Sequence, residues 1–154
     1  MTNTEIRNKV IDVCRAHIEE RMSFYLKLMN DEQLIANSYK GAMESRYDTF
    51  KEEAQARKDN MAKQVDLYMS LNSHLQTISQ NNAEDKVKYG AIVKLNNGFY
   101  YFFFANIFDD SIVFEEYDVT PISFNSPLGN AMRDRSMGEA VTFNGKEIII
   151  DEIF

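Results

Sequence analysis

The sequence predicts an α+β protein: an antiparallel helical hairpin followed by a small antiparallel sheet that carries one short helix. Two observations lead to this prediction. Only one glycine, Gly41, precedes Gly90, and both prolines lie near the C-terminus. Apolar residues recur every three or four positions in the first part of the chain, whereas the second part contains short apolar runs between turn residues. Long helices are therefore expected first, and strands joined by turns afterwards.

The hairpin is predicted from two apolar stripes. The first runs from Ile6 to Met29 at helical spacing, and the second is a heptad series after Gly41. Neither helix could bury its stripe alone, so we expect a turn within residues 37–43 and antiparallel pairing as a coiled-coil arm. Arg57 and Gln64 interrupt the heptad series, and Val65 can compensate. The series comprises Tyr47, Ala54, Met61, Tyr68 and Leu75 at one core position, and Phe50, Leu71 and Ile78 at the other.

The polar segment 79–86 lacks periodicity and predicts a linker between the arm, residues 1–78, and a domain, residues 87–154. Within the domain, strands are expected over 86–95, 98–107, 111–119, 140–143 and 146–154. Asn-Gly pairs at 97–98 and 144–145 mark two hairpin turns. Ser126 followed by Pro127 predicts the start of a short helix. The aromatic run over 99–104 predicts a central strand buried on both faces.

Composition narrows the classes of function. The net charge of −7 disfavours autonomous binding to nucleic acid, for which lysine and arginine supply most of the affinity. It is compatible with docking on a basic protein surface, or with solubility alone. No segment approaches the roughly 20 apolar residues of a membrane span, and the start lacks the features of a signal peptide. With a single cysteine, Cys14, we expect a cytoplasmic location.

Signals of catalysis are nearly absent. His17 and His74 are single residues on different predicted helices, and the sequence contains no CxxC pair or glycine-rich phosphate loop. Cys14 lies on the apolar stripe without a candidate base, which favours a packing role. We therefore expect neither an enzyme active site of its own nor an intrinsic cofactor.

Two carboxylates near the predicted turn are the candidates for chemistry. Glu44 and Asp48 are four residues apart and so share one helix face. Such a pair could hold Mg²⁺ weakly if another macromolecule completed the coordination. The alternative is an ordinary acidic first turn stabilised by the helix dipole, and periodicity alone favours that alternative.

Residues 119–154 resemble the C-terminal domain of the GreA/GreB transcript-cleavage factors. The matching elements are an Ile-Ser step at 122–123, Ser126-Pro127 with Gly129 shortly after, Ala131-Met132, and a turn at 138–141 before the closing strand. The family usually has Asp where this chain has Glu139. Residues 87–107 are also similar to Gre-related chains, in which a Val-x-x-Gly-x-x-Val strand leads into an aromatic strand.

The resemblance implies an FKBP-like C-terminal domain that docks at the rim of the secondary channel of bacterial RNA polymerase and grips a coiled coil of the β′ subunit. It assigns the docking contact to Ser126, Pro127 and Leu128. The hairpin would enter the channel, where Glu44 and Asp48 would act in catalysis by holding a Mg²⁺ shared with the polymerase active site. The chain would then be a monomeric accessory factor that meets nucleic acid only through the polymerase.

The expected tip departs from the family pattern, in which Asp follows the glycine and Glu comes three residues later. Here Ala42 and Ser45 occupy those positions, with Glu44 adjacent. Two activities therefore stay open: stimulation of transcript cleavage, and occupation of the channel without cleavage. A third alternative, from another class, is an FKBP-like interaction module whose coiled-coil arm mediates dimerisation.

Overall fold

A computed structural model describes residues 1–38, 44–80 and 85–154. Their contacts divide the chain into two compact units: one comprises Cys14–His74, and the other comprises Met1–Val13 together with Leu75–Phe154. Most of the predicted turn, including Gly41 and Ala42, lies outside the described residues, as do residues 81–84 of the predicted linker. Among the described residues, no helix is long and apolar enough to cross a membrane.

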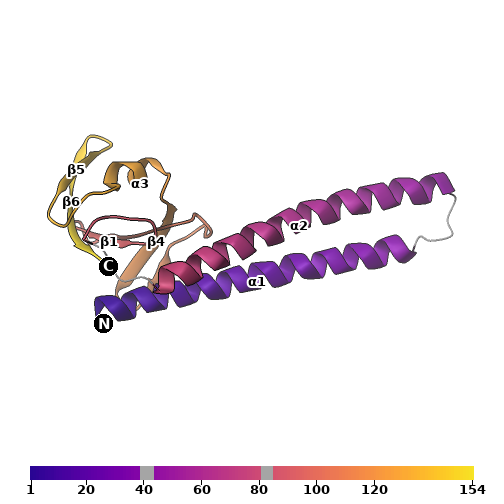
Figure 1. Ribbon diagram of the computed structural model, residues 1–154, viewed down its shortest axis with the longest axis horizontal. Helices are drawn as coiled ribbons and strands as arrows, with labels where there is room; N and C mark the ends of the chain where they lie inside the picture. The colour runs from indigo at the N-terminus through magenta and orange to yellow at the C-terminus, as the bar shows by residue number, and fades with distance from the viewer. Residues whose placement is uncertain (39–43, 81–84) are drawn as a thin grey trace. The chain divides into compact units, whose positions relative to one another are not determined.

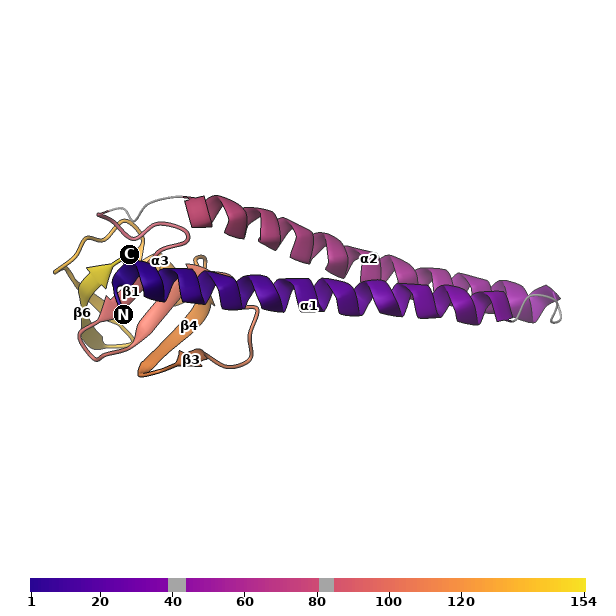
Figure 2. The ribbon, with the colours of Figure 1, turned by 90° about the horizontal axis from the view of Figure 1, so that it is seen from below.

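Two long helices form the predicted hairpin: α1 (Asn3–Ser38) and α2 (Glu44–Gln80). Within the unit Cys14–His74 they run antiparallel and side by side (Figures 1 and 2). Tyr25 stacks on Tyr68 with 6.2 Å between ring centroids, and further along α1 Glu32 meets Arg57. Later residues of α1 thus contact earlier residues of α2, as antiparallel pairing requires.

The apolar stripes lie largely where periodicity predicts them, with one exception: Phe50, a predicted core position of α2, is 39% exposed and lines an open groove with Arg46, Thr49 and Glu53. The α1 stripe is buried at Cys14 and Ile18 and half-buried further along. On α2, Ala54 is buried and Val65 is 8% exposed, so Val65 does fill the space beside the polar interruptions. Arg57 is not an apolar contact: its Nε lies 2.9 Å from a carboxylate oxygen of Glu32. A polar pair inside a coiled-coil seam favours one register over its neighbours.

The second unit contains a six-stranded sheet in the order β3-β4-β2-β1-β6-β5. Its strands are β1 (Ile92–Leu95), β2 (Tyr100–Phe104), β3 (Ile112–Phe114), β4 (Tyr117–Ser123), β5 (Ala140–Phe143) and β6 (Lys146–Ile153). The aromatic strand β2 is central, as predicted, and Phe102 and Phe103 are both fully buried although they point to opposite faces. Helix α3 (Pro127–Met132) connects β4 to β5.

The sheet differs from the expected one in two details. The sheet is mixed: β2 pairs parallel with β4, and the other four strand pairs are antiparallel. The single strand expected over 111–119 is instead the start of a hairpin, β3-β4, with Glu115 at φ 52 in the turn. After β2 the chain returns along the outer strand β3, so β4 enters the sheet beside β2 and runs in the same direction.

Both Asn-Gly turns are confirmed. Asn144 and Gly145 have φ of 51 and 73, the left-handed geometry of a two-residue hairpin turn, and they join β5 to β6. Gly98, at φ 87, lies in the turn between β1 and β2, and its N–H donates to the carbonyl of Leu95 at 3.0 Å.

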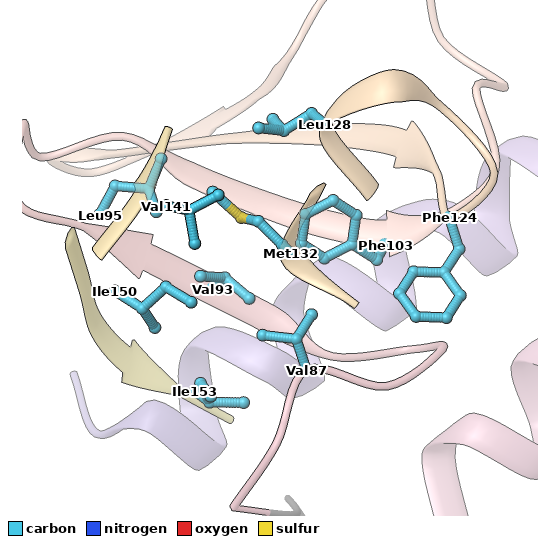
Figure 3. Close-up of a cluster of buried hydrophobic side chains, with 10 residues drawn as sticks. All are labelled: Val87, Val93, Leu95, Phe103, Phe124, Leu128, Met132, Val141, Ile150 and Ile153. Carbon is cyan, nitrogen blue, oxygen red and sulfur yellow. The ribbon is translucent and has the colours of Figure 1, made fainter. Parts of the chain in front are cut away.

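One hydrophobic cluster fills the space between α3 and the sheet (Figure 3). Leu128 and Met132 of α3 pack against side chains of β1, β2, β5 and β6. This packing anchors α3 and the loop before it to the sheet. The cluster consists of Val87, Val93, Leu95, Phe103, Phe124, Leu128, Met132, Val141, Ile150 and Ile153.

In the same unit, Arg7 joins the start of α1 to three other segments. Its guanidinium donates to the carbonyl oxygens of Gly90 at 2.6 Å, Ile78 at 3.0 Å and Phe154 at 3.2 Å. Burial lowers the pKa of Arg7 from its ordinary value. Gly90 has φ 88, and a Cβ there would lie 2.7 Å from the side chain of Ile78, so this position requires glycine.

Candidate functional site

The loop before α3 is fixed by its own hydrogen bonds. Ser126 is the N-cap of the helix: its Oγ accepts the N–H of Gly129 at 3.1 Å, and its carbonyl accepts the N–H of Asn130 at 2.8 Å. Pro127 occupies the first helical position, where a missing N–H has no cost, and it is exposed. A rigid polar turn thus presents Asn125 and Pro127 at the surface.

Leu128, the third residue that the resemblance assigns to docking, faces the core. It is 6% exposed and belongs to the cluster between α3 and the sheet (Figure 3). Its neighbour Gly129 is equally constrained, because a Cβ at that position would lie 2.4 Å from the carbonyl oxygen of Phe124. Asn125 and Pro127 therefore form the exposed surface of this loop and Ser126 is half-buried, while Leu128 and Gly129 hold the loop against the domain.

Arg133 fixes the loop from its other side. Its guanidinium lies over the Phe124 ring, 3.9 Å from the centroid, which is a close cation–π contact. Its Nη2 donates to the carbonyl of Phe124 at 3.2 Å and to Oδ1 of Asn125 at 3.1 Å. Arg133 is the C-cap residue of α3, so it connects the end of the helix to the loop that precedes the helix.

Four cations lie on the segment that contains Arg133 and on the segment paired with it. Residues 86–88 pair antiparallel with residues 134–136: the N–H of Val87 donates to the carbonyl of Arg135 at 2.8 Å, and the two segments form a bridge between Lys86 and Ser136. The pKa of Asp134 is lowered, chiefly because the Lys88 ammonium donates to its carboxylate. Positive charge on Lys86 and Arg133 adds to this effect. We call this group the basic corner: Lys86, Lys88, Arg133 and Arg135.

The second candidate region is the start of α2. Glu44 is the first residue of the helix, and its side chain is not among those that the structure describes. Asp48 is exposed and lines an open groove of about 340 Å³ along α2, together with Lys51, Glu52 and Gln55. Within the described ranges, no group of three or more His, Cys, Asp or Glu side chains is arranged to hold a metal ion.

Arg133 and Asn125 were not predicted from the sequence. Arg133 follows Ser126 by seven residues, about two helical turns, so helical spacing could have indicated that the two lie on one side of α3. The stacking on Phe124 carries no sequence signal, because it depends on how the loop folds back.

Comparison with protein-family models finds no match, and no curated protein matches the chain. Among solved structures, a structure of the transcription factor Gfh1 is 14% identical, with a TM-score of 0.35, covering 90% of this chain and 92% of its own. The GreA factor homolog 1 of Thermus thermophilus is 14% identical, with a TM-score of 0.34, covering 91% and 94%. The Gfh1 of Thermus aquaticus is 18% identical, with a TM-score of 0.33, covering 88% and 90%.

Proposed function

We propose that the chain binds bacterial RNA polymerase at its secondary channel and acts on transcription elongation. The observation that carries the proposal is the loop at Ser126-Pro127. The sequence around it has the Gre pattern, and the loop is rigid, capped and exposed at Asn125 and Pro127. A turn that its own hydrogen bonds already hold in place loses less conformational entropy when it docks on a partner than a flexible loop would.

The hairpin is the part proposed to enter the channel. Near the start of α2, Asp48 presents an exposed carboxylate. Carboxylate oxygens are the ligands that Mg²⁺ prefers, and one or two of them suffice when another macromolecule supplies the rest. Asp48 fits such a role, and Glu44, the first residue of α2, is the second carboxylate in the proposal. When bound there, the metal would activate water for hydrolysis of the RNA backbone.

Occupation of the channel without cleavage is the second candidate. It is favoured by the sequence at the predicted tip, where Ala42 and Ser45 replace the two acidic residues of the family pattern. A chain that kept the docking loop but lacked metal-holding oxygens would compete for the channel without helping the chemistry. The test must therefore separate binding from cleavage.

The experiment adds the purified protein to RNA polymerase from the same organism, stalled on a backtracked transcript with Mg²⁺, and follows transcript length and co-migration. Docking is tested by replacing Ser126 and Pro127 with alanine. Because Ser126 is a helix cap, this variant must first be shown to melt as a folded protein. Cleavage is tested with the Glu44→Ala/Asp48→Ala double variant, and Asp66→Ala, an exposed carboxylate further along α2, is the matched control.

Each outcome has one meaning. Transcript shortening that the tip double variant loses and the control retains supports a cleavage factor. Co-migration with an intact transcript supports a channel-occupying regulator. Absence of co-migration would refute the polymerase proposal and favour the protein-interaction module, whose coiled-coil arm would appear as a dimer in sedimentation.

A further inference from the structure

Large apolar side chains are exposed on both sides of the helical arm at the height of one aromatic contact. Tyr25 of α1 stacks on Tyr68 of α2, so these two residues face each other in the seam between the helices. Each tyrosine is both preceded and followed by an exposed apolar residue. The exposed fractions are 47% for Phe24, 53% for Leu26, 51% for Leu67 and 55% for Met69.

Helix geometry places these four residues on opposite sides of the seam. Successive residues of an α-helix are about 100° apart around its axis, so the two neighbours of a residue that faces the other helix project to its two flanks. Because the helices are antiparallel, the residues before the two tyrosines share one flank, and those after them share the other. One flank patch is therefore Phe24 with Leu67, and the other is Leu26 with Met69.

Polar residues occupy the corresponding positions at other heights along the arm. Ile18, Ala54 and Val65 are buried. The residues on either side of them in the sequence are His17 and Glu19, Glu53 and Gln55, and Gln64 and Asp66. Burial in the seam therefore does not require apolar flanks, and the two flank patches call for another explanation.

The Phe24 ring is already held by neighbouring side chains. It meets the Tyr25 ring edge to face, with 5.3 Å between the centroids. The Arg21 guanidinium lies 5.1 Å from the Phe24 centroid and 5.3 Å from the Tyr25 centroid, and its Nη2 donates to the Tyr25 hydroxyl at 3.2 Å. A side chain held in this way loses less conformational entropy when a partner covers it.

We propose that the secondary channel of RNA polymerase presents apolar side chains to both flank patches, so that it encloses the arm at this height. Exposed apolar residues gathered in one place mark an interaction surface. A single partner helix, or the arm of a second copy, would lie along one flank and leave the other in water. The inference rests on the proposed function, because it gives the chemistry of the wall that the arm would meet.

The test removes one flank patch at a time. The two flank variants are Phe24→Gln/Leu67→Gln and Leu26→Gln/Met69→Gln, since glutamine is polar and a good helix former. Leu34→Gln is the matched control: Leu34 is 60% exposed, and it follows Tyr25 by nine residues, or about two and a half turns, so it points away from α2.

Affinity for RNA polymerase from the same organism is measured by fluorescence anisotropy of the labelled full chain. We expect each flank variant to weaken binding about tenfold and the control to change it less than about twofold. Loss of affinity in only one flank variant, or an equal loss in the control, would overturn the enclosing contact. A wild-type dimer that a flank variant dissociates in sedimentation would overturn it as well.

A second measurement leaves three of the four side chains in place. A photoreactive phenylalanine analogue is introduced singly at position 24 and at position 26, which lie on opposite flanks. Cross-links to polymerase from both positions support the inference, and cross-links from only one contradict it. Circular dichroism and thermal melts of each variant separate loss of binding from loss of the helices.

The two proposals fail in distinguishable ways. If the wild-type chain does not bind polymerase at all, the proposed function is wrong. If the wild type binds, loses affinity through the Ser126 and Pro127 substitutions, and is indifferent to both flank variants, the function stands and the apolar contact with the channel is wrong.

Discussion

Arg7 offers the sharpest test of how the second unit is held together. It reaches three carbonyl oxygens from segments far apart in sequence, at Ile78, Gly90 and Phe154. Arg7→Met keeps the length and the apolar stem of the side chain while it removes every donor. The perturbation therefore isolates the hydrogen bonds from the packing.

The magnitude follows from which carbonyls lose their donor. The Phe154 carbonyl keeps a second donor, the N–H of Ile92 at 2.7 Å. The Ile78 and Gly90 carbonyls lose the guanidinium, and an unsatisfied buried group costs about 1–3 kcal/mol. Relief of the desolvation of Arg7 offsets part of this cost. We expect a net loss of about 2–4 kcal/mol in the free energy of unfolding, a fall in Tm of roughly 5–15 °C.

The assay is denaturant unfolding followed by circular dichroism and tyrosine fluorescence, because the chain has no tryptophan. Lys9→Met is the matched control: Lys9 is exposed on the same helix, and its loss should change stability by less than about 0.5 kcal/mol. Arg7→Lys should recover only part of the loss, since one ammonium cannot reach three separated carbonyls. A loss below about 1 kcal/mol for Arg7→Met, or full recovery by lysine, would refute this reasoning.

Three further predictions concern other parts of the fold. Gly129→Ala should destabilise the protein by about 1–3 kcal/mol, since its Cβ would meet a backbone oxygen at 2.4 Å; thermal denaturation measures this, and an unchanged Tm would contradict it. Arg57→Leu should lower the Tm by leaving the largely buried Glu32 carboxylate unpaired, and adding Glu32→Leu should restore it, as a double-mutant cycle of melts would show. Burial raises the pKa of Cys14 to about 12, so the folded state favours the neutral thiol. The resulting stability is complete below the ordinary pKa near 9 and declines between about pH 9 and 12; thiol alkylation at pH 8 should be at least about a hundredfold slower in the folded protein than in denaturant, and equal rates would contradict this burial.

Local signals account for the elements that the sequence predicted. The Asn-Gly pair at 144–145 adopts left-handed geometry that most residues avoid, so its position in the sequence already specifies a hairpin turn. Ser126 and Pro127 likewise specify a helix start, because one accepts an orphan N–H and the other needs none. Helical periodicity identified the buried face of the arm for the same reason: the repeat of the helix is fixed by backbone geometry.

Non-local pairing was beyond these signals. The turn at Glu115 has no glycine or asparagine, so the segment 111–119 read as one strand, although it leads into the β3-β4 hairpin. The parallel pairing of β2 with β4 joins residues that are far apart in the sequence, such as Tyr100 and Val119, so local signals in either strand do not predict it. The break in the heptad series at Arg57 also reflects a non-local contact, because Glu32, the residue that pairs with Arg57, lies on the other helix.

The sequence by itself determined the α+β class, the pairing of two long helices, the two Asn-Gly turns and the Ser126-Pro127 cap, because each depends on residues a few positions apart. Only the tertiary structure decided that Leu128 faces the core, that Arg133 stacks on Phe124, and that Arg7 joins α1 to three distant carbonyls. These contacts join segments whose separation along the chain is large. Their energies depend on burial and geometry that exist only once the chain has folded.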